Sequence, residues 1–274
     1  ILPHDPKTAK PLSETIIKTK FPNTYEYFNN FKKELEKRSI HKLWGKNNPF
    51  YTVYDIGTYT FAPYKVVWKR IAGAITGKAV SFACTAITPI NGHPVITDDS
   101  TILVETIDAN EAYYLAGFLN SLLSRAIIAS YSYELRQETH IVDVIKIPKF
   151  NPQDRLHIKI AELAKMAHEL AGHKYNRSAS EKFINAEEEL KRVEREIDLA
   201  VAELFGLSEE DLKEFEKLMA ILSGSELPSE DEEVEISGEP IITISNTLLE
   251  PNTPHQIEID VTNPTGVELE INYE

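Results

Sequence analysis

The sequence predicts an α+β protein, and three patterns along its 274 residues lead to this prediction. Residues 50–107 are rich in β-branched and aromatic side chains and are interrupted by Gly and Pro, which is typical of short strands joined by turns. Residues 151–222 place apolar side chains at helical spacing. Beyond residue 240 apolar and polar residues alternate, as in half-buried strands. We therefore expect a strand-rich region with packed helices, an antiparallel helical extension and a small C-terminal β module.

The first part of the chain, residues 12–39, is predicted to form two short helical segments around Pro22, because proline is tolerated at the start of a helix but not inside one. In the second segment Tyr27, Phe31 and Leu35 follow one another at intervals of four residues. This spacing predicts that the three side chains form one apolar helix face.

Strands are predicted next, at about residues 51–54, 65–71, 79–87 and 101–106. A helix is predicted from about Ala109, with Asp108 as its cap. Its apolar face consists of Leu115, Phe118, Leu119, Leu122 and Ile127. The run VIKIPKF, residues 144–150, is predicted to be a further strand that ends at Pro148.

Three amphipathic helices are predicted in the extension, residues 151–222. The first carries a stripe made of Leu156, Ile160, Leu163, Ala167 and Leu170. The second covers about residues 180–204, and the third begins with Ser208 as cap and Asp211 three residues later. Their polar positions are acidic, which is more typical of the solvated faces of a helical hairpin than of a site for a specific acidic partner.

The last part of the chain divides into an acidic linker and a β module. Residues 223–240 combine Ser, Gly and Pro with seven acidic residues, the composition of a linker. Residues 241–274 predict about three strands, with NPTG as a turn between two alternating runs. A module of this length is too short to hold a good core by itself, so we expect that it packs on the rest of the protein or is truncated.

The formal net charge of −14 is an average over unlike halves. Residues 1–150 contain 18 Lys and Arg against 14 Asp and Glu, a balance of +4, whereas residues 151–274 contain 11 against 29, a balance of −18. The acidity belongs to the second half of the chain. The total charge therefore does not exclude a polyanionic partner for the first half.

Several classes of protein are disfavoured by composition. No apolar run approaches the length of a membrane-spanning helix. The single cysteine, Cys84, excludes an intrachain disulfide and any zinc site with several cysteines. The chain starts without Met and without a signal pattern, so it is expected to be cut out of a longer protein, and a cytoplasmic location is the simplest one.

Known catalytic motifs are missing from the sequence. It contains no phosphate-binding GxxxxGK[ST] loop, no GxGxxG turn, no HExxH and no GxSxG. His168 and His173 are five residues apart, which does not bring them together on one helix face. We therefore expect no catalytic residues and no metal site in this chain.

An aromatic and basic cluster, residues 51–70, is the strongest candidate for binding. Strand alternation would send Lys65 and Lys69 to one face and Trp68 and Arg70 to the other. Nucleic-acid binding needs cations that displace counterions and planar groups that stack on bases. The alternative interpretation, that these are core or half-buried strand residues, stays open.

A second, weaker patch lies after the predicted helix at residue 109. Arg125, Arg136 and Gln137 are side chains of the types that bind guanine and adenine edges. They are also common surface residues, so residue type alone does not decide between the two interpretations.

The order of several phrases resembles the C-terminal target-recognition region of adenine-N6 DNA methyltransferases of type II and IIG restriction–modification systems. The resemblance covers about residues 1–222 and rests on a run of collinear phrases rather than on one catalytic motif. The phrases are FPNTYEYFNNFKKELEKRS, NPFYTVYDIGTYTFAPYKVVWKRIAG, PVITDDSTILVET, EAYYLAGFLNSLLSRAIIASYS, THIVDVIKIPKF and LHIKIAELAKMAHELA.

The resemblance implies a DNA-reading module without catalytic activity of its own. In the family, a separate Rossmann-like domain transfers a methyl group from S-adenosylmethionine to adenine, and its cofactor loop and Asn-Pro-Pro-Tyr/Phe loop lie upstream of this region. Neither loop is present here, because the NNPFY sequence at residues 47–51 lacks the second Pro. The implied partners are double-stranded DNA and the upstream methyltransferase domain of the same parent chain, with no membrane. Residues 1–150 would be the DNA target-recognition domain.

Within this domain, phosphate contacts are expected from Lys65, Lys69 and Arg70, which would position the protein without specifying sequence. Base contacts are expected from loops at residues 45–48, 72–78 and 88–93. The donors and acceptors of these loops are Lys46, Asn47, Asn48, Lys78, Asn91 and His93. The competing hypothesis is a protein-interaction scaffold that binds a partner subunit through its acidic helices and β tail.

Overall fold

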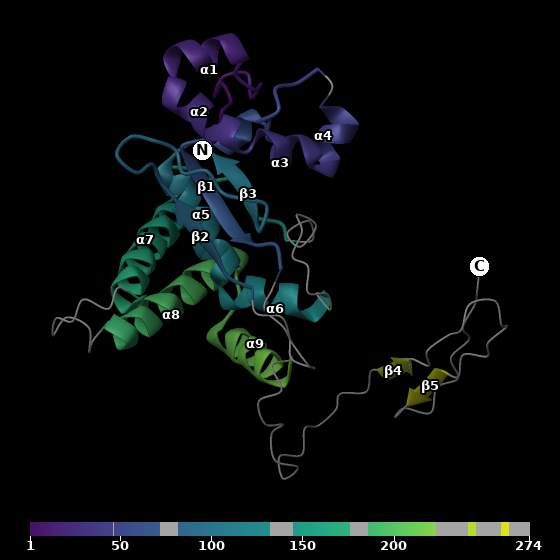
Figure 1. Cartoon of the computed structure of the whole chain (residues 1–274). Helices are drawn as coiled ribbons and strands as arrows, with labels where there is room; N and C mark the ends of the chain where they lie inside the picture. Colours follow the sequence, from purple (N-terminus) through teal and green to yellow (C-terminus); the bar gives the residue numbers. More distant parts are fainter. Residues whose placement is uncertain are drawn as a thin grey trace. The chain divides into compact units, whose positions relative to one another are not determined.

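The computed structural model describes residues 1–45, 47–71, 82–131, 145–175, 186–222, 241–244 and 259–262. The chain divides into two compact units, Ile1–Ser225 and Glu226–Glu274. The boundary lies inside the segment predicted to be a linker. Figure 1 shows the helices and strands of each unit.

The first unit combines helices with a small antiparallel sheet, which confirms the predicted α+β class. Its strands are β1 (Tyr64–Lys69), β2 (Cys84–Ile87) and β3 (Thr101–Thr106). Its helices are α1 (Glu14–Lys20), α2 (Pro22–Asn30), α3 (Lys32–Lys37), α4 (Ser39–Trp44), α5 (Ala109–Asn120), α6 (Leu122–Tyr131), α7 (Arg155–Tyr175), α8 (Ala186–Phe205) and α9 (Glu209–Leu222), with a short 3₁₀ helix η1 (Thr58–Phe61) before β1.

The sheet has β1 at its centre, in the order β2-β1-β3. Val66 pairs with Ala86 of β2 and with Val104 of β3, and Trp68 pairs with Cys84 and Ile102. Val66 and Trp68 belong to the core cluster that also contains the α5 side chains. Since successive residues of a strand point to opposite faces, this face of the sheet is the one that α5 covers.

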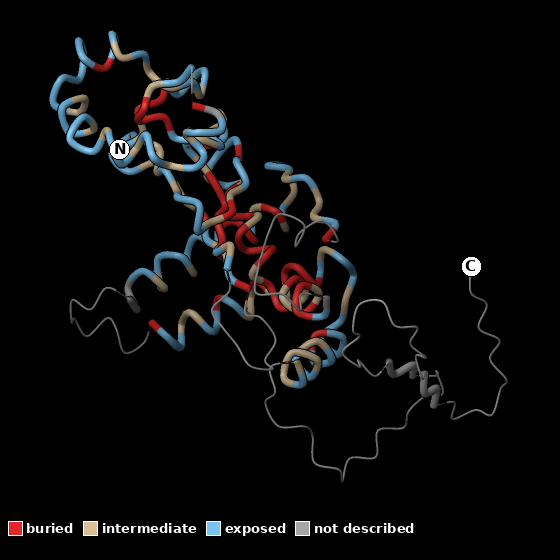
Figure 2. Tube along the Cα trace, turned by 45° about the vertical axis from the view of Figure 1, so that its right-hand side comes forward, coloured by how far each residue is buried: buried red, intermediate tan, exposed pale blue. Residues whose placement is uncertain are grey.

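Helix α5 is covered in turn by α7 and α8, so the core runs through three layers (Figures 1 and 2). Gly117 of α5 permits a close approach to α7, because a Cβ atom at this position would lie only 2.9 Å from Cβ of Ala164 and 3.0 Å from Cγ2 of Ile160. Asn120, at the end of α5, bonds both backbone groups of Cys84, accepting from its N–H at 2.9 Å and donating to its carbonyl at 2.8 Å. The helix is thereby fixed to the edge strand β2.

Helix starts agree with the sequence where caps were predicted. The Asp108 carboxylate accepts the backbone N–H of Glu111 at 2.9 Å. Ser208 and Asp211 form a reciprocal pair: the Ser208 hydroxyl accepts the Asp211 N–H at 3.2 Å, and the Asp211 carboxylate accepts the Ser208 N–H at 2.7 Å. Both predicted caps are confirmed, because each satisfies N–H groups that have no partner inside the helix.

The start of α6 is satisfied by a distant residue that sequence spacing could not indicate. The Asp198 carboxylate of α8 accepts the Leu122 N–H at 2.7 Å. Burial raises the pKa of Asp198, while the Leu122 N–H and the charges of Arg125 and Arg195 act in the opposite direction. Asp198 therefore connects α8 to α6 through this hydrogen bond, but burial of its ionised carboxylate lowers the stability of the fold.

We predict that Asp198→Ala lowers the free energy of unfolding at pH 7 by about 1–3 kcal/mol, because the buried Leu122 N–H loses its acceptor. Asp198→Asn should lower the free energy of unfolding by less, since an amide oxygen still accepts this bond.

The raised pKa of Asp198 means that the ionised carboxylate weakens the fold above its unfolded pKa of about 4. Raising the pH from 4 to 7 should therefore lower the stability of the wild type relative to Asp198→Asn. Urea unfolding at both pH values measures this, and equal costs for Ala and Asn would contradict it.

Four predictions of secondary structure are wrong in the described residues. The single helix predicted from Ala109 is two helices, because α5 ends at Asn120 and α6 begins at Leu122 after a bend of 58°. Residues 51–54 form turn and bend structure, and residues 145–150 form no strand. The predicted stripe of Tyr27, Phe31 and Leu35 is broken, because Phe31 lies between two helices and has φ −108° and ψ 13°. Tyr27 and Phe31 are exposed, and the aromatic side chains that pack inward are Tyr25 and Phe28.

The second unit contains the antiparallel pair β4 (Ile241–Ile244) and β5 (Ile259–Thr262), with Ile241 opposite Thr262. The other predicted strand of this module lies outside the described residues. Across the described part of the chain no single helix is long and apolar enough to cross a membrane, and α5 with the first part of α6 reaches that length only as a pair bent by 58°.

Candidate nucleic-acid interface

The positive charge of the first half is concentrated in residues 1–50. They contain ten Lys and Arg against five Asp and Glu, a balance of +5, whereas residues 51–100 contain four against three. In the structure, residues 1–50 form α1–α4 and their connections. The basic part of the protein is therefore this group of N-terminal helices and not strand β1.

These helices are held together by a small hydrophobic cluster and by one arginine. Ile17, Phe50 and Tyr51 are buried against Tyr25, Phe28 and Leu35. The Arg38 guanidinium donates to the carbonyls of Leu35 and Phe50 at 2.9 Å and of Thr52 at 3.0 Å. The Tyr51 hydroxyl donates to the Leu12 carbonyl at 2.7 Å, and burial raises the pKa of Tyr51 to about 12. The segment at residues 50–52 thus anchors both the N-terminal loop and α3.

Some lysines of this region form ion pairs or lie over aromatic rings, and others form no ion pair with the described residues. Lys18 pairs with Glu14 at 2.9 Å and lies 4.7 Å from the centre of the Tyr25 ring. Lys32 lies 3.9 Å from Glu36 and 5.1 Å from the centre of the Phe50 ring. Lys20, Lys33 and Lys37 are exposed and form no ion pair with the described residues. These three ammonium groups are available to a polyanion.

A cleft of about 750 Å³ opens between the loop before α1 and the loop after α4. Its lining combines amides, a hydroxyl, an ammonium and a carboxylate, contributed by Lys10, Pro11, Ser13, Glu14, Asn47, Asn48 and Pro49. The Glu14 carboxylate is held by Lys18 and accepts the Tyr25 hydroxyl at 3.2 Å; the hydrogen bond with Lys18 lowers the pKa of Glu14 most. Asn47 and Asn48 are exposed. The cleft thus offers donors and acceptors suited to phosphate oxygens and base edges.

The prediction that Lys65 contacts phosphate is wrong. Its exposed fraction is 0%, and its ammonium donates to the Ala62 carbonyl and, at 2.9 Å, to the Val95 carbonyl. Burial lowers the pKa of Lys65, and the charge of Glu105, which is opposite it on β3, acts in the other direction. Strand alternation alone assigned Lys65 to a cationic surface, but both faces of β1 are buried from Lys65 to Trp68.

We predict that Lys65→Met leaves the salt dependence of DNA binding unchanged in the folded variant, because this ammonium cannot reach a phosphate. The matched variant Lys69→Met removes an exposed charge at the end of the same strand. If β1 contacts the DNA backbone, Lys69→Met should lower the slope of log K against log salt by about 0.9. Fluorescence anisotropy at several salt concentrations measures both slopes, and a lower slope for Lys65→Met would contradict the buried placement.

The other predicted site residues fall into three groups. Asn91 and His93 are exposed at a tight turn in which Ile90 and His93 exchange backbone hydrogen bonds at 2.9 Å, and Asn91 has φ 52°. Arg70 is half-buried just after β1, and Arg125 is half-buried beside Asp198 within the helical layers, where it stabilises a carboxylate. The residues outside the described part of the chain are Lys46, Lys78, Arg136 and Gln137.

Asn47 and Asn48, which are neighbours in the sequence, both line one cleft, whereas Asn91 and His93 lie on a different turn. The structure adds Lys10 and Ser13 to the cleft, and Lys20, Lys33 and Lys37 to the same group of helices. A charge count over successive fifty-residue windows would have found this region. The aromatic run at 51–70 indicated the neighbouring segment instead.

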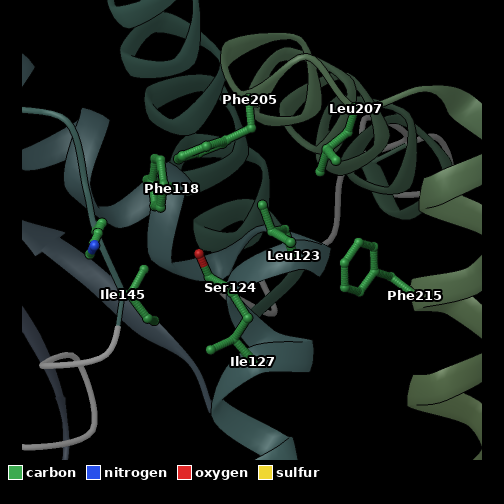
Figure 3. A pocket seen from close by; sticks show the side chains of 9 residues that line it. Phe118, Leu123, Ser124, Ile127, Ile145, Phe205, Leu207 and Phe215 are labelled. Carbon is green, nitrogen blue, oxygen red and sulfur yellow. The ribbon is translucent and has the colours of Figure 1, made fainter.

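A second hollow is apolar and has a different character (Figure 3). It measures about 470 Å³ and lies among α5, α6, α8 and α9. Rings of Phe118, Phe205 and Phe215 line it, and the Ser124 oxygen accepts a hydrogen bond from the Ser121 hydroxyl at 3.3 Å. Lys146 also lines it, and the mainly apolar lining is suited to apolar groups.

No cluster of three or more His, Cys, Asp or Glu side chains among the described residues could hold a metal ion. Burial raises the pKa of the Cys84 thiol, so it is protonated at neutral pH and poorly nucleophilic.

Comparisons with known proteins give one informative similarity. No protein-family model matches the chain. No solved structure matches it. The type II methyltransferase M.NspV of Nostoc sp. (strain ATCC 29411 / PCC 7524) is 28% identical over 113 residues, which are 40% of this chain and 21% of that protein. Part of this chain is related to a type II methyltransferase. The matched region corresponds to about a fifth of the relative's length.

Proposed function

We propose that this chain recognises a target site in double-stranded DNA as the C-terminal target-recognition region of an adenine-N6 DNA methyltransferase. Methyl transfer from S-adenosylmethionine would be done by an upstream domain of the same parent protein, within a restriction–modification or phage-defence system. The chain itself would position the duplex while the target adenine is flipped into that domain. Its location would be the cytoplasm, where both DNA and cofactor are found.

The observation that supports this proposal most is the basic group of N-terminal helices in an otherwise acidic protein. Residues 1–50 have a balance of +5, and Lys20, Lys33 and Lys37 are exposed without ion pairs to the described residues. Cations of this kind bind DNA by releasing condensed counterions from phosphates. The adjacent cleft adds Lys10, Asn47 and Asn48, whose side chains can bind phosphates or base edges. The similarity to a type II methyltransferase supports the same assignment.

The test is a fluorescence-anisotropy titration of a mixed-sequence duplex with the full chain at low and at moderate salt. We expect weak binding, with a Kd on the order of micromolar, because in this proposal the upstream domain supplies the other half of the clamp on the DNA. The affinity should fall steeply as salt increases. Lack of binding at low salt, or binding that salt does not weaken, would overturn the proposal.

The second candidate function is a protein-interaction scaffold that binds a partner subunit. The apolar hollow of about 470 Å³ favours it, since Phe205 at its edge is 43% exposed. Exposed apolar patches of this kind often mark protein interfaces. A scaffold without a DNA role would show no salt-sensitive affinity for duplex DNA, so the same titration distinguishes the two functions.

A further inference from the structure

Helix α2 has two faces of different composition, and none of its residues is buried. Tyr25 and Phe28 face the small hydrophobic cluster of the N-terminal helices. Asn23, Tyr27 and Asn30 are spaced by four and three residues, so they lie together on the opposite, exposed face. Phe31, directly after the helix, continues this face. We refer to Asn23, Tyr27, Asn30 and Phe31 as the α2 outer face.

Two aromatic rings on this face are left in solvent. Tyr27 is 52% exposed and Phe31 is 47% exposed, and their ring centres lie 5.3 Å apart in an edge-to-face arrangement. Aromatic side chains normally bury most of their 150–250 Å² on folding. The packing of the described residues gives no reason for this exposed pair, so we infer that the face meets a partner.

The surroundings favour DNA over protein as this partner. Lys20 precedes α2, and Lys33 and Lys37 follow it, and all three are exposed without ion pairs to the described residues. Lysine is depleted at protein–protein interfaces, whereas free cations flanking an exposed helix are typical of phosphate contacts. A Glu26 carboxylate borders the face, and such a group can accept a hydrogen bond from cytosine N4.

We propose that α2 is a base-reading helix that enters the major groove of the target duplex with its outer face. Asn23 and Asn30 would bind adenine through N6 and N7, and Tyr27 and Phe31 would contact thymine methyl groups. With a rise of about 1.5 Å per residue, nine residues span about 14 Å, or about four base pairs. This assignment rests on the proposed function. Beyond that function, it names the side chains that select the DNA sequence, and it predicts that the selected site contains A·T pairs.

The test begins with the full chain and a library of randomised duplexes, from which bound sequences are selected and read. Anisotropy titrations then compare the selected duplex with a scrambled one. The variants are Asn23→Ala/Asn30→Ala and Tyr27→Ala/Phe31→Ala, and the matched control is Asn29→Ala, an exposed asparagine of α2 outside the outer face. Alanine favours the helix, so circular dichroism should show all variants folded.

We expect an A·T-containing preferred site for the wild type and for Asn29→Ala. The asparagine double variant should lose preference for the selected over the scrambled duplex by about tenfold or more, while its affinity for the scrambled duplex and its salt slope stay unchanged. An Asn23→Ala/Asn30→Ala variant that keeps the wild-type preference would overturn the inference, as would wild-type binding without any sequence preference; in both cases the DNA-binding proposal would stand. No wild-type binding to any duplex would overturn both.

Discussion

Replacing Lys20, Lys33 and Lys37 together by alanine is expected to weaken duplex binding at low salt by about tenfold or more, and to lower the salt slope by up to about 2.7. The physical reason is that these ammonium groups have no carboxylate partner among the described residues, so they bring their full charge to the phosphates. Lys18 and Lys32, which are paired, should contribute less.

The matched control for this variant replaces Lys159, Lys165 and Lys213 by alanine. These lysines are also exposed, but they lie on α7 and α9, and the change in net charge is the same. Equal losses of affinity in the two triple variants would mean that only the total charge matters. That result would remove the N-terminal helices from the interface.

Gly117→Val is expected to lower the free energy of unfolding by about 3 kcal/mol, and Gly117→Ala by about 1–3 kcal/mol. A Cβ at this position would lie 2.9 Å from Cβ of Ala164 and 3.3 Å from the Ile160 carbonyl oxygen, and both of these residues are buried. The contacted atoms are a Cβ and a backbone oxygen, so they cannot move aside as the end of a flexible side chain could. Helices α5 and α7 would have to separate, which would disturb all three layers of the core.

Gly172→Ala is the control for this prediction, and its sign is opposite. Gly172 lies in α7, and a Cβ there would meet no atom within 4 Å. Removing a helical glycine without a clash should raise stability by about 0.5–1 kcal/mol. Thermal unfolding of the three variants measures both effects. A neutral Gly117→Ala would show that the α5–α7 contact is looser than the structure has it.

The fold could be predicted from the sequence where local chemistry decided it. Asp108, Ser208 and Asp211 act as caps because their side chains compete for backbone N–H groups regardless of tertiary context. Strands β1 and β3 follow β-branched and aromatic runs bounded by turn residues. The predicted strand at 51–54 failed because tertiary hydrogen bonds hold this segment in another conformation. The Arg38 guanidinium donates to the carbonyls of Phe50 and Thr52, and the hydroxyl of the buried Tyr51 donates to the Leu12 carbonyl.

The candidate site was predictable only in part. Asn47 and Asn48, which were predicted to contact bases, are exposed and line the cleft, and their contact with bases stays a prediction. Lys65 failed because alternation gives the direction of a side chain but not what covers it, and here the Ala62 and Val95 carbonyls surround the ammonium. Tyr27 and Phe31 were assigned to an apolar face on the assumption of a single helix. In the structure α2 ends at Asn30 and α3 begins at Lys32, so the helical spacing does not continue through Phe31.

The most direct test of the interface is photo-crosslinking of the full chain to a duplex that carries 5-bromodeoxyuridine, followed by mass spectrometry of the crosslinked peptides. The N-terminal helices should supply them, with sites between residues 10 and 48, on the cleft and on α2. Crosslinks confined to α7–α9, or none under conditions where the duplex is bound, would contradict the assignment of DNA recognition to this basic region.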